Sequence, residues 1–269
     1  MNLPANLADL ISATIPTEAQ MAQLSTARRE RRGHPAGREK ALQNTTKLSD
    51  WLARCQQAGI PYIEAHFSPE ILVDEMIAAL DGKGPSPSLE NAVKWLEERQ
   101  TSATMWRWDQ CAPSDVKCAV QDQRPIPANM PVCIDDPRLI DILFEINCST
   151  TAIALRPIVQ PQKHAGFPVE FRCYVDALGR VAVSNYYPQM SLPESFYPQA
   201  QAAGELAKLL HPLVRESFTA DFLLTPEGEL KFLEGGPAWG QGAHPCCFSP
   251  ADLKPGRILL GPEPGSVES

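Results

Sequence analysis

Short apolar runs with interleaved polar residues predict β-strands from residue 103 onward. Apolar residues at helical spacing predict helices in both halves of the chain. Strands are expected at 103–108, 151–159, 169–175, 181–187, 220–224, 230–233 and 257–260. Helices are expected at 47–57, 69–80, 88–99, 137–146 and 201–217, and the stretch 109–117 is expected to be a loop. The last helix is predicted to turn its larger apolar residues inward, namely Leu206, Leu209, Leu210, Leu213 and Val214. The first hundred residues are therefore predicted to be rich in helix.

The strands at 220–224 and 230–233 form a predicted hairpin with one acid in the first strand, Asp221, and one at the end of the second, Glu234. A two-residue turn at Glu227 and Gly228 would place the acids opposite each other, with Cβ atoms about 4.5–5.5 Å apart. A three-residue turn with a bulge would shift that register by one residue. Carboxylates held so close repel unless a proton or a cation lies between them, and Mg²⁺ favours such oxygen ligands. The alternative is a surface hairpin whose acids face water.

Three of the predicted strands each carry one arginine among apolar or aromatic residues: Arg107, Arg156 and Arg172. An isolated arginine in a strand usually lies at an exposed edge or pairs with an acid. Three of them, on strands leading to a two-acid hairpin, favour one site for a polyanion. Guanidinium groups match phosphate oxygens, and a bridging metal ion would neutralise the remaining charge. The sequence has neither of the glycine-rich phosphate motifs that open a helix, G-x-x-x-x-G-K-[ST] or G-x-G-x-x-G.

Composition narrows the class of protein. A chain of 269 residues fits one large domain or two lobes, and its net charge of −8 argues against general nucleic-acid binding. A basic run at 28–32 could still contact RNA or an acidic partner. No apolar run approaches the length of a membrane span and no signal peptide is evident, so a cytoplasmic protein without a membrane partner is expected. The eight cysteines include no C-x-x-C pair, so a zinc cage is not expected and the cysteines are predicted to be reduced.

Four segments carry a family resemblance: 105–115, 154–159, 170–175 and 221–237. They resemble the ATP-grasp superfamily, and within it the cell-division-cycle D123-like branch with its small bacterial and phage relatives. The resemblance covers about half of the chain. It implies an α+β fold in which two lobes that contain antiparallel sheets enclose a nucleotide cleft. An α-rich N-terminal region is then expected at 1–100, the nucleotide-binding core at 101–249 and a tail at 250–269.

The resemblance also implies ATP and Mg²⁺ as cofactors. Arg107, Arg156 and Arg172 would bind the phosphates, and Asp221 and Glu234 would hold Mg²⁺. Glu170 would contribute to the ATP site, Pro157, Ile158 and Val159 would edge the adenine, and Arg172 and Glu234 would be the catalytic residues. Arg107 stands where the family has a lysine, for which Lys117 or Lys163 could substitute, and Gly236 stands where the family commonly has a metal-binding asparagine.

The implied activity is that of an ATP-dependent carboxylate–amine ligase that acts through an acyl phosphate. Its acceptor could be a peptide, a protein or a small amine, beside Trp239, Gln241 and His244. A second interpretation is a nucleotide-dependent assembly or binding protein without turnover, which the glycine at position 236 favours. A third is a metal-dependent hydrolase that uses Asp221, Glu234 and His244.

Overall fold

The computed structural model describes residues 47–126, 130, 132–136, 139, 142, 148–238, 245–248 and 253–262. Two compact units divide the chain, 1–44 with 141–148 and 45–140 with 149–269, and every element described below belongs to the second. The basic run at 28–32 and most of the helix predicted at 137–146 lie outside the described residues. None of the described helices is long and apolar enough to cross a membrane.

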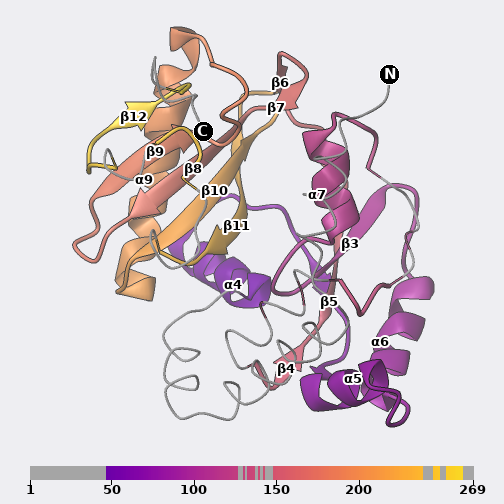
Figure 1. The fold of residues 1–269 in the computed structure, drawn as a ribbon. Coiled ribbons are helices and arrows are strands. Elements are labelled where there is room, and N and C mark those ends of the chain that lie inside the picture. The colour runs from indigo at the N-terminus through magenta and orange to yellow at the C-terminus, as the bar shows by residue number, and fades with distance from the viewer. Residues whose placement is uncertain are drawn as a thin grey trace, which may run out of the picture. The chain divides into compact units, whose positions relative to one another are not determined.

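A five-stranded sheet in the order β11-β10-β8-β9-β12 occupies the second half of the chain (Figure 1). Its strands are β8 (Glu170–Val175), β9 (Val181–Asn185), β10 (Phe218–Leu224), β11 (Leu230–Gly236) and β12 (Ile258–Leu259). β12 lies parallel to β9, and the other neighbouring strands pair antiparallel. Side chains alternate between the two faces of each strand, so Phe171, Cys173 and Val175 of β8 enter the hydrophobic core. The polar residues between them face the other way.

The 3₁₀ turn η1 (Glu194–Phe196) leads into helix α9 (Tyr197–Val214), which packs against the core face of this sheet. Its buried side is made of small residues with one leucine: Ala200, Ala203, Gly204, Ala207 and Leu210. A Cβ on Gly204 would lie 3.1 Å from Val183 Cγ2, so the glycine allows the helix to approach the strand closely. The predicted leucine stripe was therefore partly wrong. Leu210 is fully buried, but Leu209 is 52% exposed.

A three-stranded antiparallel sheet in the order β1-β5-β3 forms the second layer, from β1 (His66–Phe67), β5 (Ile153–Pro157) and β3 (Thr104–Trp108). Near it lie helices α5 (Val73–Leu80) and α6 (Pro87–Glu97) and the strand pair β2 (Ile71–Leu72) and β4 (Thr150–Thr151). A small hairpin, β6 (Lys163–His164) and β7 (Phe167–Pro168), precedes β8.

Helix α7 (Ser114–Gln121) begins within the stretch 109–117 that was predicted to be a loop, so that prediction was wrong from residue 114 onward. The carboxylate of Asp136 accepts hydrogen bonds from the backbone N of Ser114 at 2.7 Å and from its Oγ at 2.9 Å. These bonds satisfy donors of the first turn, where a helix has no internal acceptor. A residue 22 positions away thus supplies the start signal of this helix.

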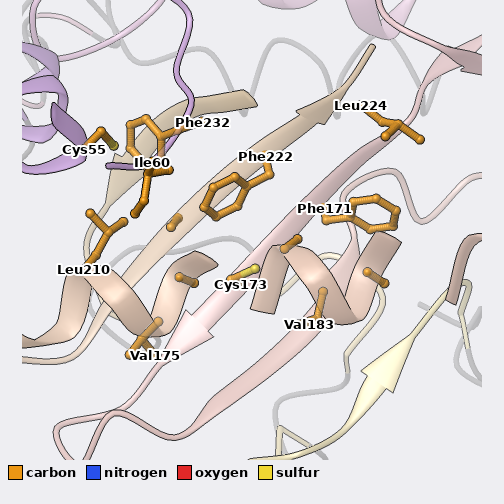
Figure 2. Close-up of a cluster of buried hydrophobic side chains, with 14 of the residues drawn as sticks. Cys55, Ile60, Phe171, Cys173, Val175, Val183, Leu210, Phe222, Leu224 and Phe232 are labelled. Carbon is orange, nitrogen blue, oxygen red and sulfur yellow. The ribbon is translucent and has the colours of Figure 1, made fainter. Parts of the chain in front are cut away.

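Helix α4 (Leu48–Ala58) joins the two layers. Its N-terminus is held by Asp109, at the end of β3: the carboxylate accepts from Ser49 N and Ser49 Oγ, both at 2.8 Å. Its buried face packs on β11 and α9, and the Trp51 ring centroid lies 5.2 Å from that of Phe218. Figure 2 shows Cys55 of α4 beside Phe232 in the same core cluster as Phe222, Phe171 and Leu210.

Candidate functional site

The β10–β11 hairpin places Asp221 opposite Glu234, as predicted, although by a different route. The loop holds three residues, 226–228, and is closed by a hydrogen bond from Thr225 N to the Glu229 carbonyl. This loop pairs Leu224 with Leu230, one position away from the register of a two-residue turn. A β-bulge then adds one residue to β11, because Phe222 pairs with Phe232 while Asp221 pairs with Glu234. The two shifts cancel.

Each of the two acids is paired with an arginine. Arg172 donates from Nε and Nη2 to the two carboxylate oxygens of Asp221, at 2.8 and 2.6 Å. Arg107 donates from Nη1 to Glu234 Oε2 at 2.8 Å. Two opposed carboxylates are thus compensated by two guanidinium groups, which explains how they lie side by side in the protein alone.

The pKa values of the two acids are shifted in opposite directions, because burial and the paired arginine compete at each of them. Burial raises the pKa of Asp221, and the ion pair with Arg172 opposes this without overcoming it. Burial also acts to raise the pKa of Glu234, but the charge and hydrogen bond of Arg107 outweigh it and hold that pKa at about 2. Glu234 is therefore a carboxylate at neutral pH.

Among the described residues Arg156 has no ion-pair partner, but it joins three segments. Its Nη1 donates to the Leu233 carbonyl at 2.8 Å, and its Nη2 donates to the Ile63 carbonyl at 2.7 Å. The side chain is buried, and its Nε has no hydrogen-bond partner within the described part of the chain. Burial, followed by repulsion from the nearby Arg107, lowers the pKa of Arg156 to about 9. Arg156 thus has one buried donor left for an acceptor.

A cavity of about 200 Å³ opens beside these groups, between β3, β5 and α7 on one side and β8, β10 and β11 on the other. Its charged lining residues are Arg107, Lys117, Arg156, Glu170 and Glu234. The remaining walls are mostly apolar and include the predicted Pro157 and Val159. A second cavity of about 640 Å³ shares Val159 and four other wall residues with the first and adds Ile158 and Lys163. A mostly apolar cavity with a few convergent polar groups is typical of a small-molecule site.

Two tyrosines that follow β9 complete the wall. The ring of Tyr186 covers the guanidinium of Arg172, whose Cζ lies 4.7 Å from the ring centroid. The hydroxyl of Tyr187 donates to Glu170 Oε2 at 3.2 Å. Burial, and then the charges of the hairpin acids, raise the pKa of Glu170. Arg172 and Asp221 are not among the residues that line the two cavities, so they support this wall from behind.

The structure therefore brings the three arginines and the two acids together, and it adds residues to which sequence reasoning had assigned no site. Lys117, named only as a possible substitute for the lysine, enters the cavity from α7, and its Nζ lies 3.5 Å from the hydroxyl of Tyr186. For Tyr186 and Tyr187, which also line the cavity, the sequence did hold a signal: two adjacent tyrosines directly after a buried strand. Trp239, Gln241 and His244, predicted beside the acceptor, lie outside the described residues.

Position 236 leaves little room for a larger side chain. Gly236 pairs with Thr219 across the hairpin, and a Cβ on it would lie 2.9 Å from Thr219 Oγ1. That hydroxyl donates to the Pro237 carbonyl at 3.1 Å. An asparagine at this position would therefore require Thr219 to move.

Comparisons with known proteins identify the fold. No protein-family model and no curated protein matches the sequence. The structure of Cdc123 from Schizosaccharomyces pombe matches with a TM-score of 0.50 and 14% identity, over 83% of this chain and 97% of that chain. The complex of biotin carboxylase with β,γ-ATP from Campylobacter jejuni matches with a TM-score of 0.40 and 13% identity, over 74% of this chain and 42% of that one. The predicted division of the chain into an N-terminal region (1–100), a core (101–249) and a tail (250–269) stays a prediction. The α+β architecture with two layers of mainly antiparallel sheet is confirmed, and the chain shares its fold with the Cdc123 structure.

Proposed function

We propose that this protein binds ATP, as its magnesium complex, in the cavity between its two sheets. The observation that carries the proposal is the gathering of Arg107, Lys117 and Arg156 at one cavity, next to the carboxylate of Glu234. These three cations suit phosphate oxygens, and the buried Nε of Arg156 leaves a donor for one of them. The apolar walls around Pro157 and Val159 suit a nucleobase. In this proposal Ile158 lies at the outer edge of the base.

The donor set also fits a magnesium ion bound together with a triphosphate. Mg²⁺ in such sites takes one or two carboxylates, with phosphate oxygens and waters as its other ligands. Glu234 lines the cavity and would be the carboxylate ligand. Asp221 lies opposite it behind the cavity wall with both oxygens held by Arg172, so it would contribute its negative charge rather than a ligand oxygen. Among the described residues no group of three or more His, Cys, Asp or Glu is placed to hold a metal by itself, which agrees with this division of ligands.

The first candidate activity is ATP-dependent carboxylate–amine ligation. Bound ATP would supply the phosphoryl group that activates a carboxylate. The protein's own part would be to hold the reactants in line and to neutralise charge, with Glu234 at the metal and Arg107 and Lys117 on the phosphates. Arg172 would position Asp221 and Tyr186 from behind the wall, and Glu170 would bound the ATP site beside Tyr187.

A second candidate is a nucleotide-dependent binding or assembly protein without turnover. Gly236 favours it, because this position offers no side-chain ligand for a metal and a Cβ there would lie 2.9 Å from Thr219 Oγ1.

Isothermal titration with a non-hydrolysable ATP analogue and Mg²⁺ tests the shared proposal. We expect saturable binding that weakens at least about tenfold in the Lys117→Met variant, since a charge-assisted contact is lost. The matched control is Lys208→Met, which removes the same charge from an exposed pair on α9 and should bind like the wild type. Absence of saturable binding, or equal loss in both variants, would contradict the proposal.

ADP formation then separates the two candidates. ADP production that rises with one member of a panel of carboxylate and amine acceptors supports the ligase. Saturable nucleotide binding with no ADP across that panel supports the binding protein.

A further inference from the structure

The two acid–arginine pairs of the hairpin differ in how tightly they are held. Arg172 and Asp221 share two hydrogen bonds, and their side chains are 10% and 2% exposed. Arg107 gives Glu234 a single hydrogen bond, and the side chains are 5% and 30% exposed, so in this pair the acid is the accessible partner. Buried bidentate pairs are hard to separate because both charges would lose their compensation, whereas an accessible single contact can exchange partners. The Arg107–Glu234 pair is therefore the one that a ligand can open.

Both partners of this weaker pair face the cavity, where other charges compete for them. Arg107 lies close enough to Arg156 to repel it, and Lys117 adds a third positive charge. A carboxylate in contact with a guanidinium is a poor ligand for a free divalent cation, because one oxygen is occupied and the neighbouring charge repels the incoming ion. The same positive charges that repel a metal ion would attract an anion into the cavity. Arg107 could then form hydrogen bonds to that anion.

We propose that Arg107 is an exchangeable counter-ion that prevents Glu234 from binding a metal ion until a triphosphate binds. In the nucleotide-free protein Arg107 forms an ion pair with Glu234. A triphosphate draws Arg107 onto its own oxygens, and Glu234 is released to the accompanying divalent cation. This inference rests on the proposed function. It adds that metal and nucleotide bind together, because Arg107 pairs either with the Glu234 carboxylate or with the triphosphate.

Metal binding to the nucleotide-free protein tests the exchange without any turnover. Mn²⁺ is used as the probe, and free Mn²⁺ is followed by electron paramagnetic resonance. The Arg107→Met variant should bind Mn²⁺ about tenfold or more tightly than the wild type, within the usual range of coupling between sites. The same variant should bind the ATP analogue more weakly. Opposite effects of one substitution on the two ligands are the signature of an exchanged partner.

The Lys117→Met variant is the matched control for that experiment. It removes one positive charge from the same cavity, but the direct hydrogen bond to Glu234 stays in place. Its affinity for Mn²⁺ should rise less than about threefold, because only the general field changes. The double variant Arg107→Met with Glu234→Gln should lose the gain, which would place the bound metal at Glu234.

A milder second variant covers the case in which Arg107→Met does not fold. Glu234→Gln is nearly isosteric and changes a partly exposed side chain. It frees Arg107, so the metal-free ATP analogue in excess chelator should bind several-fold more tightly than to the wild type. Unchanged or weaker binding would overturn the exchange.

The outcomes distinguish a failure of this inference from a failure of the proposed nucleotide binding. If the wild type binds no ATP analogue, the proposed function fails, whatever the metal titrations show. If the analogue binds but Arg107→Met gains no affinity for Mn²⁺, or Lys117→Met gains as much, the counter-ion role of Arg107 is refuted and the nucleotide site stands.

Discussion

The Asp221→Asn substitution should destabilise the protein far more than Glu234→Gln, although the two acids lie opposite each other. Asp221 is 2% exposed and is the bidentate partner of Arg172, which is itself buried. Asparagine removes the negative charge and leaves the guanidinium buried without compensation. Glu234 holds Arg107 through one hydrogen bond at a side chain that is 30% exposed.

The expected magnitudes follow from this difference in burial. Removing one partner of a buried ion pair costs about 3–5 kcal/mol, and an asparagine that keeps one acceptor should fall at about 3 kcal/mol. In the Arg107–Glu234 pair only the acid is partly open to solvent and Arg107 is buried, so Glu234→Gln should cost about 1 kcal/mol, the upper end of the range for exposed pairs. The native state of a typical domain is stable by about 5–15 kcal/mol, so Asp221→Asn should remain folded but lose a large part of its margin.

Urea denaturation followed by tryptophan fluorescence measures both effects. Trp51, Trp106 and Trp108 are buried in the two layers, so unfolding exposes all three. With a urea dependence of about 3 kcal/mol per molar, the midpoint should fall by about 1 M in Asp221→Asn and by about 0.3 M in Glu234→Gln. Equal midpoints for the two variants would refute the reasoning.

A double-mutant cycle checks that the ion pair is the cause. Arg172→Met and Asp221→Leu should each be strongly destabilising alone, because each leaves the other member of the pair buried and unpaired. The double variant Arg172→Met with Asp221→Leu should recover part of the loss, since no charge then stays buried. Loss of nucleotide binding in Asp221→Asn therefore needs a stability measurement beside it before it can be ascribed to a lost metal ligand. Glu234→Gln is the cleaner test of the metal.

Three further substitutions probe the frame of the site. Asp109→Ala should lower stability by about 1–2 kcal/mol, since it removes the acceptors at the start of α4, and an unchanged urea midpoint would contradict that capping role. The pKa of Glu170 is raised by burial and by the hairpin acids, so its contribution to stability becomes more unfavourable as pH rises above its ordinary value of 4.5. Glu170→Gln should therefore be more stable than the wild type near about pH 8, and the two urea midpoints should converge near about pH 4; a constant difference would exclude this titration. A Cβ on Gly235 would lie 2.2 Å from Trp51 Cε2, so Gly235→Ala should cost about 1–3 kcal/mol and shift the tryptophan emission. Gly228→Ala is the control for emission: its Cβ would lie in open space, so the emission should stay unchanged, although its φ of +86° should itself cost about 1–2 kcal/mol.

Local pattern was enough to predict most elements, because each depends on residues near it in the chain. It failed at α7, whose apolar stripe is short (Val116, Ala119 and Val120) and whose first turn is fixed by the distant Asp136. On α9 it was partly wrong, because Leu210 is buried as predicted but Leu209 is exposed. That helix carries both leucines and alanines at helical spacing, and the closeness of the Val183 side chain selects the smaller residues. Which stripe packs is decided by the partner surface, which periodicity does not contain.

Residue types at the site were predictable, and their partners were not. Arg172 and Asp221 are cross-strand neighbours in β8 and β10, a pairing that appears only when the strand order is known. Arg107 and Glu234 are 127 positions apart, and no local rule connects them. The sequence pointed to guanidinium and carboxylate groups near one polyanion. Packing determined which guanidinium compensates which carboxylate.

The β-bulge in β11 reconciles two demands that a regular strand cannot meet. Phe232 and Glu234 are two positions apart, so in an unbroken strand they would share a face. Phe232 belongs to the core cluster with Phe222, whereas Glu234 lines the cavity. Burying a phenylalanine is worth about 1.5–3 kcal/mol, and an unpaired carboxylate in that core would cost more than this. The extra residue at Leu233 changes the parity of the strand between them. The aromatic ring then stays in the core while the acid reaches Arg107, and the bulge follows from these opposed preferences as much as from the turn.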